Sequence, residues 1–179
     1  MIDALKAREY DKAAKLINED RLGANARDEA GAPALSIAVQ LRQPILAVSL
    51  LNAYNPRVDV NAATPEGYTA LHYAVGNGDR NVVKALLRRG ADPNARIRQA
   101  RSGGWGPLHF GCRGGDAKIV EALLDYDADP LLEGHAGENA FQVAEDAAVS
   151  FTVRKQLAAL LNAALAKRAS AAEAGSGEL

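Results

Sequence analysis

A pattern that recurs along the chain constrains its fold more than any other feature of the sequence. Residues 67–74 and 104–111 share the order Gly-aromatic-x-x-Leu-His-aromatic-small, at an offset of 37 residues. The same offset relates three further pairs of segments, which are 78–79 with 115–116, 86–87 with 123–124, and 91–93 with 128–130. Self-similarity at a period of this length predicts a stack of similar supersecondary units.

Weaker copies of the pattern flank the two clear ones. Residues 34–38 match residues 70–74 at an offset of 36, and residues 139–144 match residues 106–111 at an offset of 33. A degraded copy lies before them, near residues 16–25. We therefore expect one domain over residues 1–168, with a cap at 1–27, repeats at about 28–61, 65–97, 102–134 and 135–168, and a disordered tail at 169–179.

Each unit predicts two short helices joined by tight turns. In the second unit, Thr69 is suited to begin the first helix, Gly78 to end it, and Asp79 to cap the next. The apolar residues between positions 82 and 87 have helical spacing, and Gly90 marks the end of that helix. One such pair buries little apolar surface alone, so several pairs must stack to form a continuous core.

These residues resemble the ankyrin-repeat family. The family's pattern is matched by Gly67-Tyr-Thr-Ala-Leu-His72 and, further along, by Leu86-Leu-Arg-Arg-Gly-Ala-Asp92. The resemblance is strongest over residues 65–130, whereas the first repeat has Leu35-Ser36 in place of Leu-His. It implies an all-α solenoid of helix-turn-helix repeats and a structural role for His72 and His109, whose rings bond turn backbone and tie one repeat to the next.

Residues that could carry chemistry fit the repeat better than they fit an active site. Cys112 stands at an apolar helix position, which predicts a buried and inert thiol. His135 lies in a glycine-flanked turn and is expected to be solvated. The glycines of residues 103–106 lack the Lys-Ser/Thr of a phosphate-binding loop, and the carboxylates of residues 125–129 lack the Gly and Glu of a calcium loop. We expect neither an enzyme nor a bound metal or cofactor.

Composition narrows the class of protein further. The chain is 48% hydrophobic but 5% aromatic, which favours closely packed helices over a β-sandwich. It has 21 Lys and Arg against 22 Asp and Glu, unlike a polybasic nucleic-acid binder. The one cysteine fits a reducing compartment, and the sequence shows neither a signal peptide nor a run of 18 apolar residues. These features predict a soluble cytoplasmic protein.

The balanced total charge conceals two segments of opposite sign. Residues 80–118 carry nine Lys and Arg and two Asp, which is a net charge of +7. Residues 119–150 carry eight Asp and Glu and no Lys or Arg, which is a net charge of −8. This pattern predicts an electrically polar molecule whose basic centre attracts an acidic partner, although solvated faces also vary in charge without consequence.

Aromatic and arginine side chains mark the expected binding surface. Stacking of repeats would bring together aromatic residues of the second and third units on the concave face, with arginines nearby, a composition typical of interface hot spots. The predicted partner-binding residues are Tyr68, Tyr73, Arg96, Arg98, Arg101, Trp105, Phe110 and Arg113. Trp105 is expected at an exposed turn tip with little core around it, whereas for Phe110 packing between repeats is an equally good interpretation.

The sequence therefore predicts a monomeric module that binds another protein through the concave face and finger tips of repeats two and three. The expected partner is a protein with an acidic patch, and an inhibitor or immunity-type role is a narrower hypothesis. Neither nucleic acid nor a membrane is an expected partner. The alternatives are nucleic-acid binding through the basic segment and a cryptic hydrolytic activity.

Overall fold

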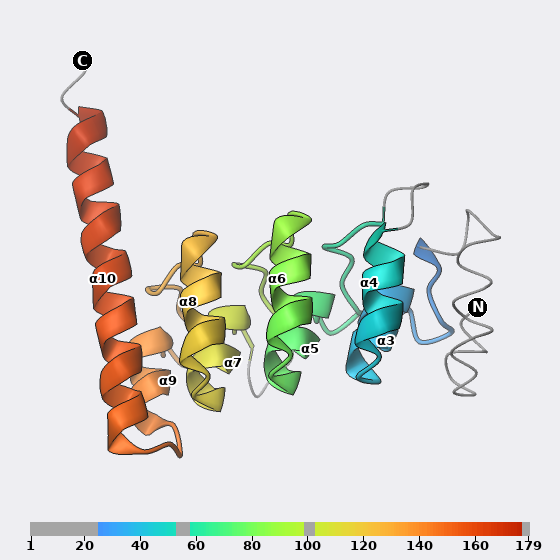
Figure 1. The fold of residues 1–179 in the computed structure, drawn as a ribbon, viewed down its shortest axis with the longest axis horizontal. Coiled ribbons are helices and arrows are strands. Elements are labelled where there is room, and N and C mark those ends of the chain that lie inside the picture. Colours follow the sequence, from blue (N-terminus) through green and yellow to red (C-terminus); the bar gives the residue numbers. More distant parts are fainter. Residues whose placement is uncertain (1–24, 53–57, 99–102, 177–179) are drawn as a thin grey trace.

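The helices of the chain follow one another in pairs in a computed structural model that describes residues 25–52, 58–98 and 103–176 (Figure 1). The pairs are α3 (Ala34–Gln40) with α4 (Pro44–Asn52), α5 (Ala70–Asn77) with α6 (Arg80–Arg88), α7 (Pro107–Gly114) with α8 (Ala117–Asp125), and α9 (Ala140–Asp146) with α10 (Phe151–Ser176). The described residues form two isolated β-bridges but no strand. The predicted all-helical repeat solenoid is confirmed.

The helices lie in two rows (Figure 1). The first helices of the pairs pack on one another in the order α3, α5, α7 and α9, and the second helices pack in the order α4, α6, α8 and α10. We call the surface formed by α3, α5, α7 and α9, together with the turns before them, the inner face. Among the described residues, none of these helices is both long and apolar enough to cross a membrane.

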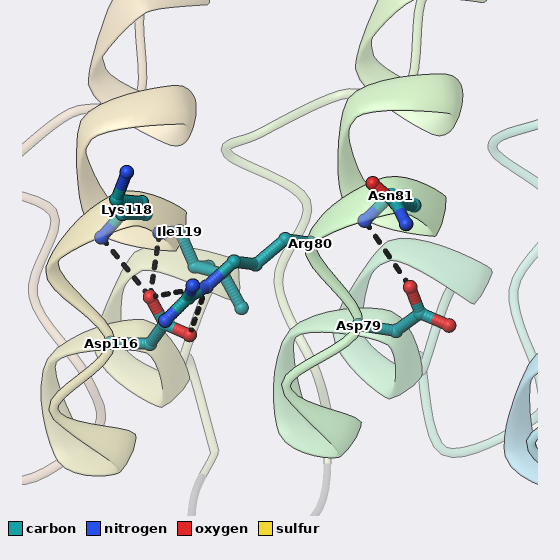
Figure 2. Close-up of polar contacts among 6 residues, drawn as sticks. All are labelled: Asp79, Arg80, Asn81, Asp116, Lys118 and Ile119. Atoms are coloured by element: carbon teal, nitrogen blue, oxygen red, sulfur yellow. Dashed lines mark hydrogen bonds and ion pairs between the residues drawn. The ribbon is translucent and has the colours of Figure 1, made fainter.

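Helix caps stand where the sequence predicts them. Gly78 ends α5 with a left-handed backbone, φ +72°, which an L side chain rarely adopts. The Asp79 carboxylate then accepts hydrogen bonds from the first turn of α6, and Asp116 does the same for α8 (Figure 2). Arg80 donates from Nε to both oxygens of Asp116, at 2.8 and 3.2 Å, and so links the second pair to the third.

Asparagine side chains also join successive repeats, and the sequence analysis did not identify them. The Asp92 backbone N–H donates to Oδ1 of Asn61 at 2.7 Å, and the Asp129 N–H donates to Oδ1 of Asn94 at 2.7 Å. Asn25 accepts in the same way from the Asp59 N–H at 2.8 Å. Each asparagine therefore holds its own turn against the chain that follows the next helix pair.

The last helix is longer than expected. The sequence predicts that the last repeat ends at residue 168 and that a disordered tail follows from 169, but α10 continues to Ser176, so the tail expected at 169–176 is wrong. The reason is the composition of this stretch, in which alanine is frequent and has the highest helix propensity of any residue. Residues 177–179 of the predicted tail and residues 1–24 of the predicted cap lie outside the described residues.

Candidate functional site

Four aromatic side chains of the second and third repeats form one cluster on the inner face. Tyr68 stacks on Tyr73 with ring centroids 5.4 Å apart, and it lies 6.3 Å from Phe110 across the boundary between the repeats. Phe110 in turn meets Trp105 edge to face at 5.3 Å. The prediction that stacking brings these four residues together is confirmed.

Two histidines hold the turns beneath this cluster. The Thr69 backbone N–H donates to Nδ1 of His72 at 3.1 Å, and the Gly106 N–H donates to Nδ1 of His109 at 3.1 Å. Since Nδ1 accepts in each ring, the proton of the neutral ring is on Nε2. In His109 this Nε2 lies 3.3 Å from the carbonyl oxygen of Glu138, which belongs to the next repeat.

Burial keeps both histidines neutral. His72 is 2% exposed, and burial lowers its pKa to about 4, with nearby backbone carbonyl groups offsetting the effect in part. Burial also lowers the pKa of His109. The bonds at Nδ1 and the burial support a structural role for both rings. The expected hydrogen bond to the next repeat is found for His109, whereas Nε2 of His72 is buried without a hydrogen-bond partner among the described residues.

Trp105 does not have the exposed position that the sequence analysis expected. The side chain is 9% exposed and belongs to the hydrophobic core. Its indole ring stacks on His109 with centroids 5.5 Å apart, and its Nε1–H donates a hydrogen bond to Oε1 of Glu138. The expectation that it has little core to leave is wrong, because the fourth repeat covers the turn on which it stands.

Glu138 is the residue that the sequence analysis missed. It occupies the position of Trp105 one repeat later, and it is the first carboxylate in the series Ala32, Tyr68, Trp105, Glu138. The hydrogen bond from Trp105 lowers the pKa of its carboxyl group. Gly134 makes room for both side chains, because a Cβ at Gly134 would lie 2.6 Å from Oε1 of Glu138 and 2.8 Å from Cδ1 of Trp105. The replacement of an aromatic residue by a carboxylate at this position of the fourth repeat was the sequence signal that could have identified Glu138.

The tyrosines and Phe110 keep part of their surface on the inner face. Tyr68, Tyr73 and Phe110 are each half-buried and pack against the core from its edge. Phe110 also meets His72 edge to face at 5.9 Å, so it contributes to packing between repeats. The two interpretations of Phe110 are therefore compatible, since one side of the ring packs and the other remains accessible.

The predicted arginines lie in different surroundings. Arg113, in the last turn of α7, is exposed and has its guanidinium carbon 5.7 Å from the centre of the Trp105 ring. Arg96 donates to the backbone carbonyl groups of Gly104 and Glu133, so it joins the turn before α7 to the turn before α9. Arg98 is exposed, and Arg101 lies outside the described residues.

The basic segment of residues 80–118 does not form one patch. Lys84 and Arg88 project from α6 in the outer row of helices, whereas Arg113 lies on α7 in the inner row. Arg80 is paired with Asp116, and the guanidinium of Arg89 donates to the side chain of Asn52. The positive charge is distributed over both faces and the turns, which does not favour binding to a single stretch of phosphates.

The remaining candidates show no catalytic arrangement in the described part of the chain. Cys112 is fully buried, and burial raises the pKa of its thiol to about 12, so the thiol is inert as predicted. His135 is exposed. Among the described residues, no group of three or more His, Cys, Asp or Glu side chains could hold a metal ion.

A hollow of about 410 Å³ lies beside the aromatic cluster, between the third and fourth repeats. Trp105 and Arg113 line it on one side, and Glu138, Val143 and Asp146 line it on the other. Residues 147–148, which are alanines, complete the wall after α9. The inner face thus combines half-buried aromatic rings with a cavity that carries charges of both signs.

Comparison with known proteins identifies the repeat independently. A family model for ankyrin repeats (three copies) matches residues 1–97, and a model for a single ankyrin repeat matches residues 103–135. The chain is 41% identical to the B-cell lymphoma 3 protein homolog of Mus musculus over 71 residues, which are 39% of this chain and 16% of that protein. It is 40% identical to alpha-latrocrustotoxin-Lt1a of Latrodectus tredecimguttatus over 65 residues, 36% of this chain and 4% of that protein. The chain therefore spans less than a fifth of either relative.

Proposed function

The chain belongs to the ankyrin-repeat family, and on this basis we propose that it binds another protein through the inner face of its second and third repeats. Ankyrin repeats are generally protein–protein interaction modules, and proteins of the family are generally not enzymes.

The observation that carries the proposal is the set of half-buried rings of Tyr68, Tyr73 and Phe110. Their contacts at 5.4 and 6.3 Å hold the rings in fixed positions before a partner arrives. Side chains that are already ordered lose little entropy on binding, so more of the contact energy appears as affinity. Trp105 helps to hold this surface in place, since its ring meets that of Phe110 edge to face.

Positively charged side chains at the surface favour one orientation of a bound partner. Arg113 is exposed beside the Trp105 ring, and Arg98 is exposed in the chain before α7. Both favour acidic groups on the partner. A protein that covers a partner's working surface acts as an inhibitor, and this role, including that of an immunity-type protein, is part of the proposal. A monomeric state and a cytoplasmic location also belong to it, and the single buried cysteine supports the latter.

The test compares capture of partners by matched variants. The double variant Tyr73→Ala with Phe110→Ala is immobilised beside the wild type and beside Tyr126→Ala, which removes a ring that is 41% exposed at the end of α8. Proteins retained from native lysate are identified by mass spectrometry. We expect a specific partner to be retained by the wild type and by Tyr126→Ala but lost from the double variant. Equal retention by all three proteins would contradict the proposed surface.

A further inference from the structure

The hollow between the third and fourth repeats exists because the fourth repeat has no aromatic residues at the positions of Trp105 and Phe110. The fourth repeat has Val143 at the position of Phe110 and Glu138 at the position of Trp105, at an offset of 33 residues. Between the second and third repeats, the rings of Tyr68 and Phe110 fill the corresponding space, with their centroids 6.3 Å apart. The shorter side chains leave a volume of about 410 Å³ next to the surface assigned to the partner.

The charged side chains around the hollow, Arg113, Glu138 and Asp146, form no ion pair with one another. Asp146 forms no ion pair or side-chain hydrogen bond within the described part of the chain, although Arg113 lines the same hollow. The guanidinium of Arg113 is held over the Trp105 ring at 5.7 Å. Glu138 uses Oε1 to accept from Trp105, while its Oε2 is buried and accepts no hydrogen bond from the described residues.

The charges favour a cation. The hollow has two carboxylates, Glu138 and Asp146, against one guanidinium, that of Arg113. A cleft lined mainly by one sign of charge concentrates ligands of the opposite sign. Val143 and the alanines at 147–148 provide an apolar wall along which a methylene chain could lie.

We propose that this hollow is the part of the interface that takes a lysine or arginine side chain of the partner protein, with its cationic end beside Asp146 and its methylene chain against Val143. The inference rests on the proposed function and adds to it. The partner would then present acidic groups toward Arg98 and Arg113 and a basic residue toward the fourth repeat. Two opposite charges at fixed positions would fix the orientation of the partner along the solenoid.

The proposal is tested with small probes, so it does not require the partner. The labelled protein is titrated with n-butylguanidinium, n-butylammonium and butyrate at constant ionic strength, and backbone amide signals and the Trp105 indole signal are followed by NMR. We expect both cations to produce saturable shifts at residues 146–148 and at the indole, and butyrate to produce none there. Shifts caused by butyrate alone, or by none of the probes, would overturn the proposal.

Variants distinguish binding in the hollow from a general effect of net charge. Asp146→Asn should weaken binding of the two cations by about 1.4- to fivefold, the range of one solvent-exposed charge pair. Asp125→Asn removes the same charge from the outer helix α8 and should leave binding unchanged. Equal weakening by both variants would contradict the assignment. If the cations fail to bind while the Tyr73 and Phe110 double variant still loses the partner, this inference fails and the proposed function stands.

Discussion

At the scale of single residues, buried polar side chains hold the repeats together. His109 is bonded at one nitrogen to the turn before α7 and lies at the other against the carbonyl of Glu138 in the next repeat. Trp105 reaches the same residue through its indole N–H. One position of the fourth repeat therefore receives contacts from two residues of the third, and loss of either contact should loosen the boundary between them.

Trp105→Ala should lower the free energy of unfolding by about 3 kcal/mol, the lower end of the range for removing a buried aromatic side chain. The ring is 9% exposed and stacks on His109, so its removal leaves a cavity. Urea unfolding measures the change. Tyr126→Ala is the control, because its side chain is 41% exposed and should cost under about 1 kcal/mol. Similar costs for both variants would show that Trp105 is not part of the core.

The buried histidines make stability depend on pH. The folded-state pKa of His72 is about 4, below the ordinary value of 6.5, so protonation favours the unfolded chain. The stabilisation is complete above pH 6.5 and is lost as the pH falls toward 4. Between pH 7.5 and pH 5 we expect His72 alone to remove about 2 kcal/mol from the free energy of unfolding.

Urea unfolding of the wild type and of His72→Gln at several pH values tests this expectation. The variant should be less stable at neutral pH, where lost hydrogen bonds cost about 1–3 kcal/mol, but its stability should change less on acidification. Parallel pH profiles for the two proteins would contradict the assignment. The lowered pKa of His109 contributes to the pH dependence of stability in the wild type and in the variant alike. The difference between the two pH profiles is therefore specific to His72.

At the scale of the helix, α6 and α8 begin with equivalent N-cap residues, Asp79 and Asp116, whose contributions to stability can be compared directly (Figure 2). Asp79 accepts from the N–H groups of Asn81 and Val82 at 3.2 and 3.1 Å, and Asp116 makes the equivalent bonds to the first turn of α8. Asp116 differs in that it also accepts from Arg80, which lies one repeat earlier. Comparison of the two therefore separates capping from the link between repeats.

Asp79→Ala should cost about 1 kcal/mol, the usual cost of a lost N-cap. Asp116→Ala should cost more by about 0.2–1 kcal/mol, because it also removes a partly exposed ion pair. A double-mutant cycle with Arg80→Ala measures the second quantity by urea unfolding. A coupling energy of zero would mean that the pair does not stabilise the contact between repeats.

At the scale of the whole molecule, stability is a property of the row of helix pairs. Each pair contacts its neighbours in the row, so the unfolding of one exposes the core of the next. We expect a helical far-UV circular dichroism spectrum and a single urea transition. The transition seen by circular dichroism should coincide with that of Trp105 fluorescence, since this tryptophan is the only one in the chain. Separate midpoints would show that the third repeat unfolds independently of the others.

The charge distribution also acts on the whole molecule, through the rate of encounter with a partner. Arg98→Ser should slow association with the captured partner about two- to threefold and reduce its salt dependence, while dissociation stays nearly constant. Arg96 is unsuitable for this test, because its bonds to Gly104 and Glu133 make it structural. Arg88→Ser, on the outer helix α6, is the control for net charge. Surface-plasmon kinetics measure both rates, and faster dissociation of Arg98→Ser would contradict a steering role.

Features that depend only on neighbours along the chain are predictable from the amino-acid sequence. The period of the pattern, the cap residues such as Asp79 and the glycine that ends α5 are local signals, and each is found where it was predicted. The proximity of Tyr68 and Phe110 also followed from the sequence, because equivalent positions of stacked units must come together. Local propensity and repetition are sufficient for these features, since each unit repeats the same geometry.

Which side chains the neighbouring repeat covers depends instead on the packing of the folded chain. Trp105 stands between glycines in a turn, and the sequence indicates exposure, yet Gly134 and Glu138 in the turn before α9 enclose it. Packing of the turn before α9 also gives Arg96 a hydrogen bond to the backbone carbonyl of Glu133 and leaves the hollow beside Val143. The burial and the hydrogen-bond partners of these residues depend on the sizes of side chains that are far apart in the sequence, such as Trp105 and Glu138, which are separated by 33 residues. A repeat pattern specifies where such side chains lie but not how well they fit together.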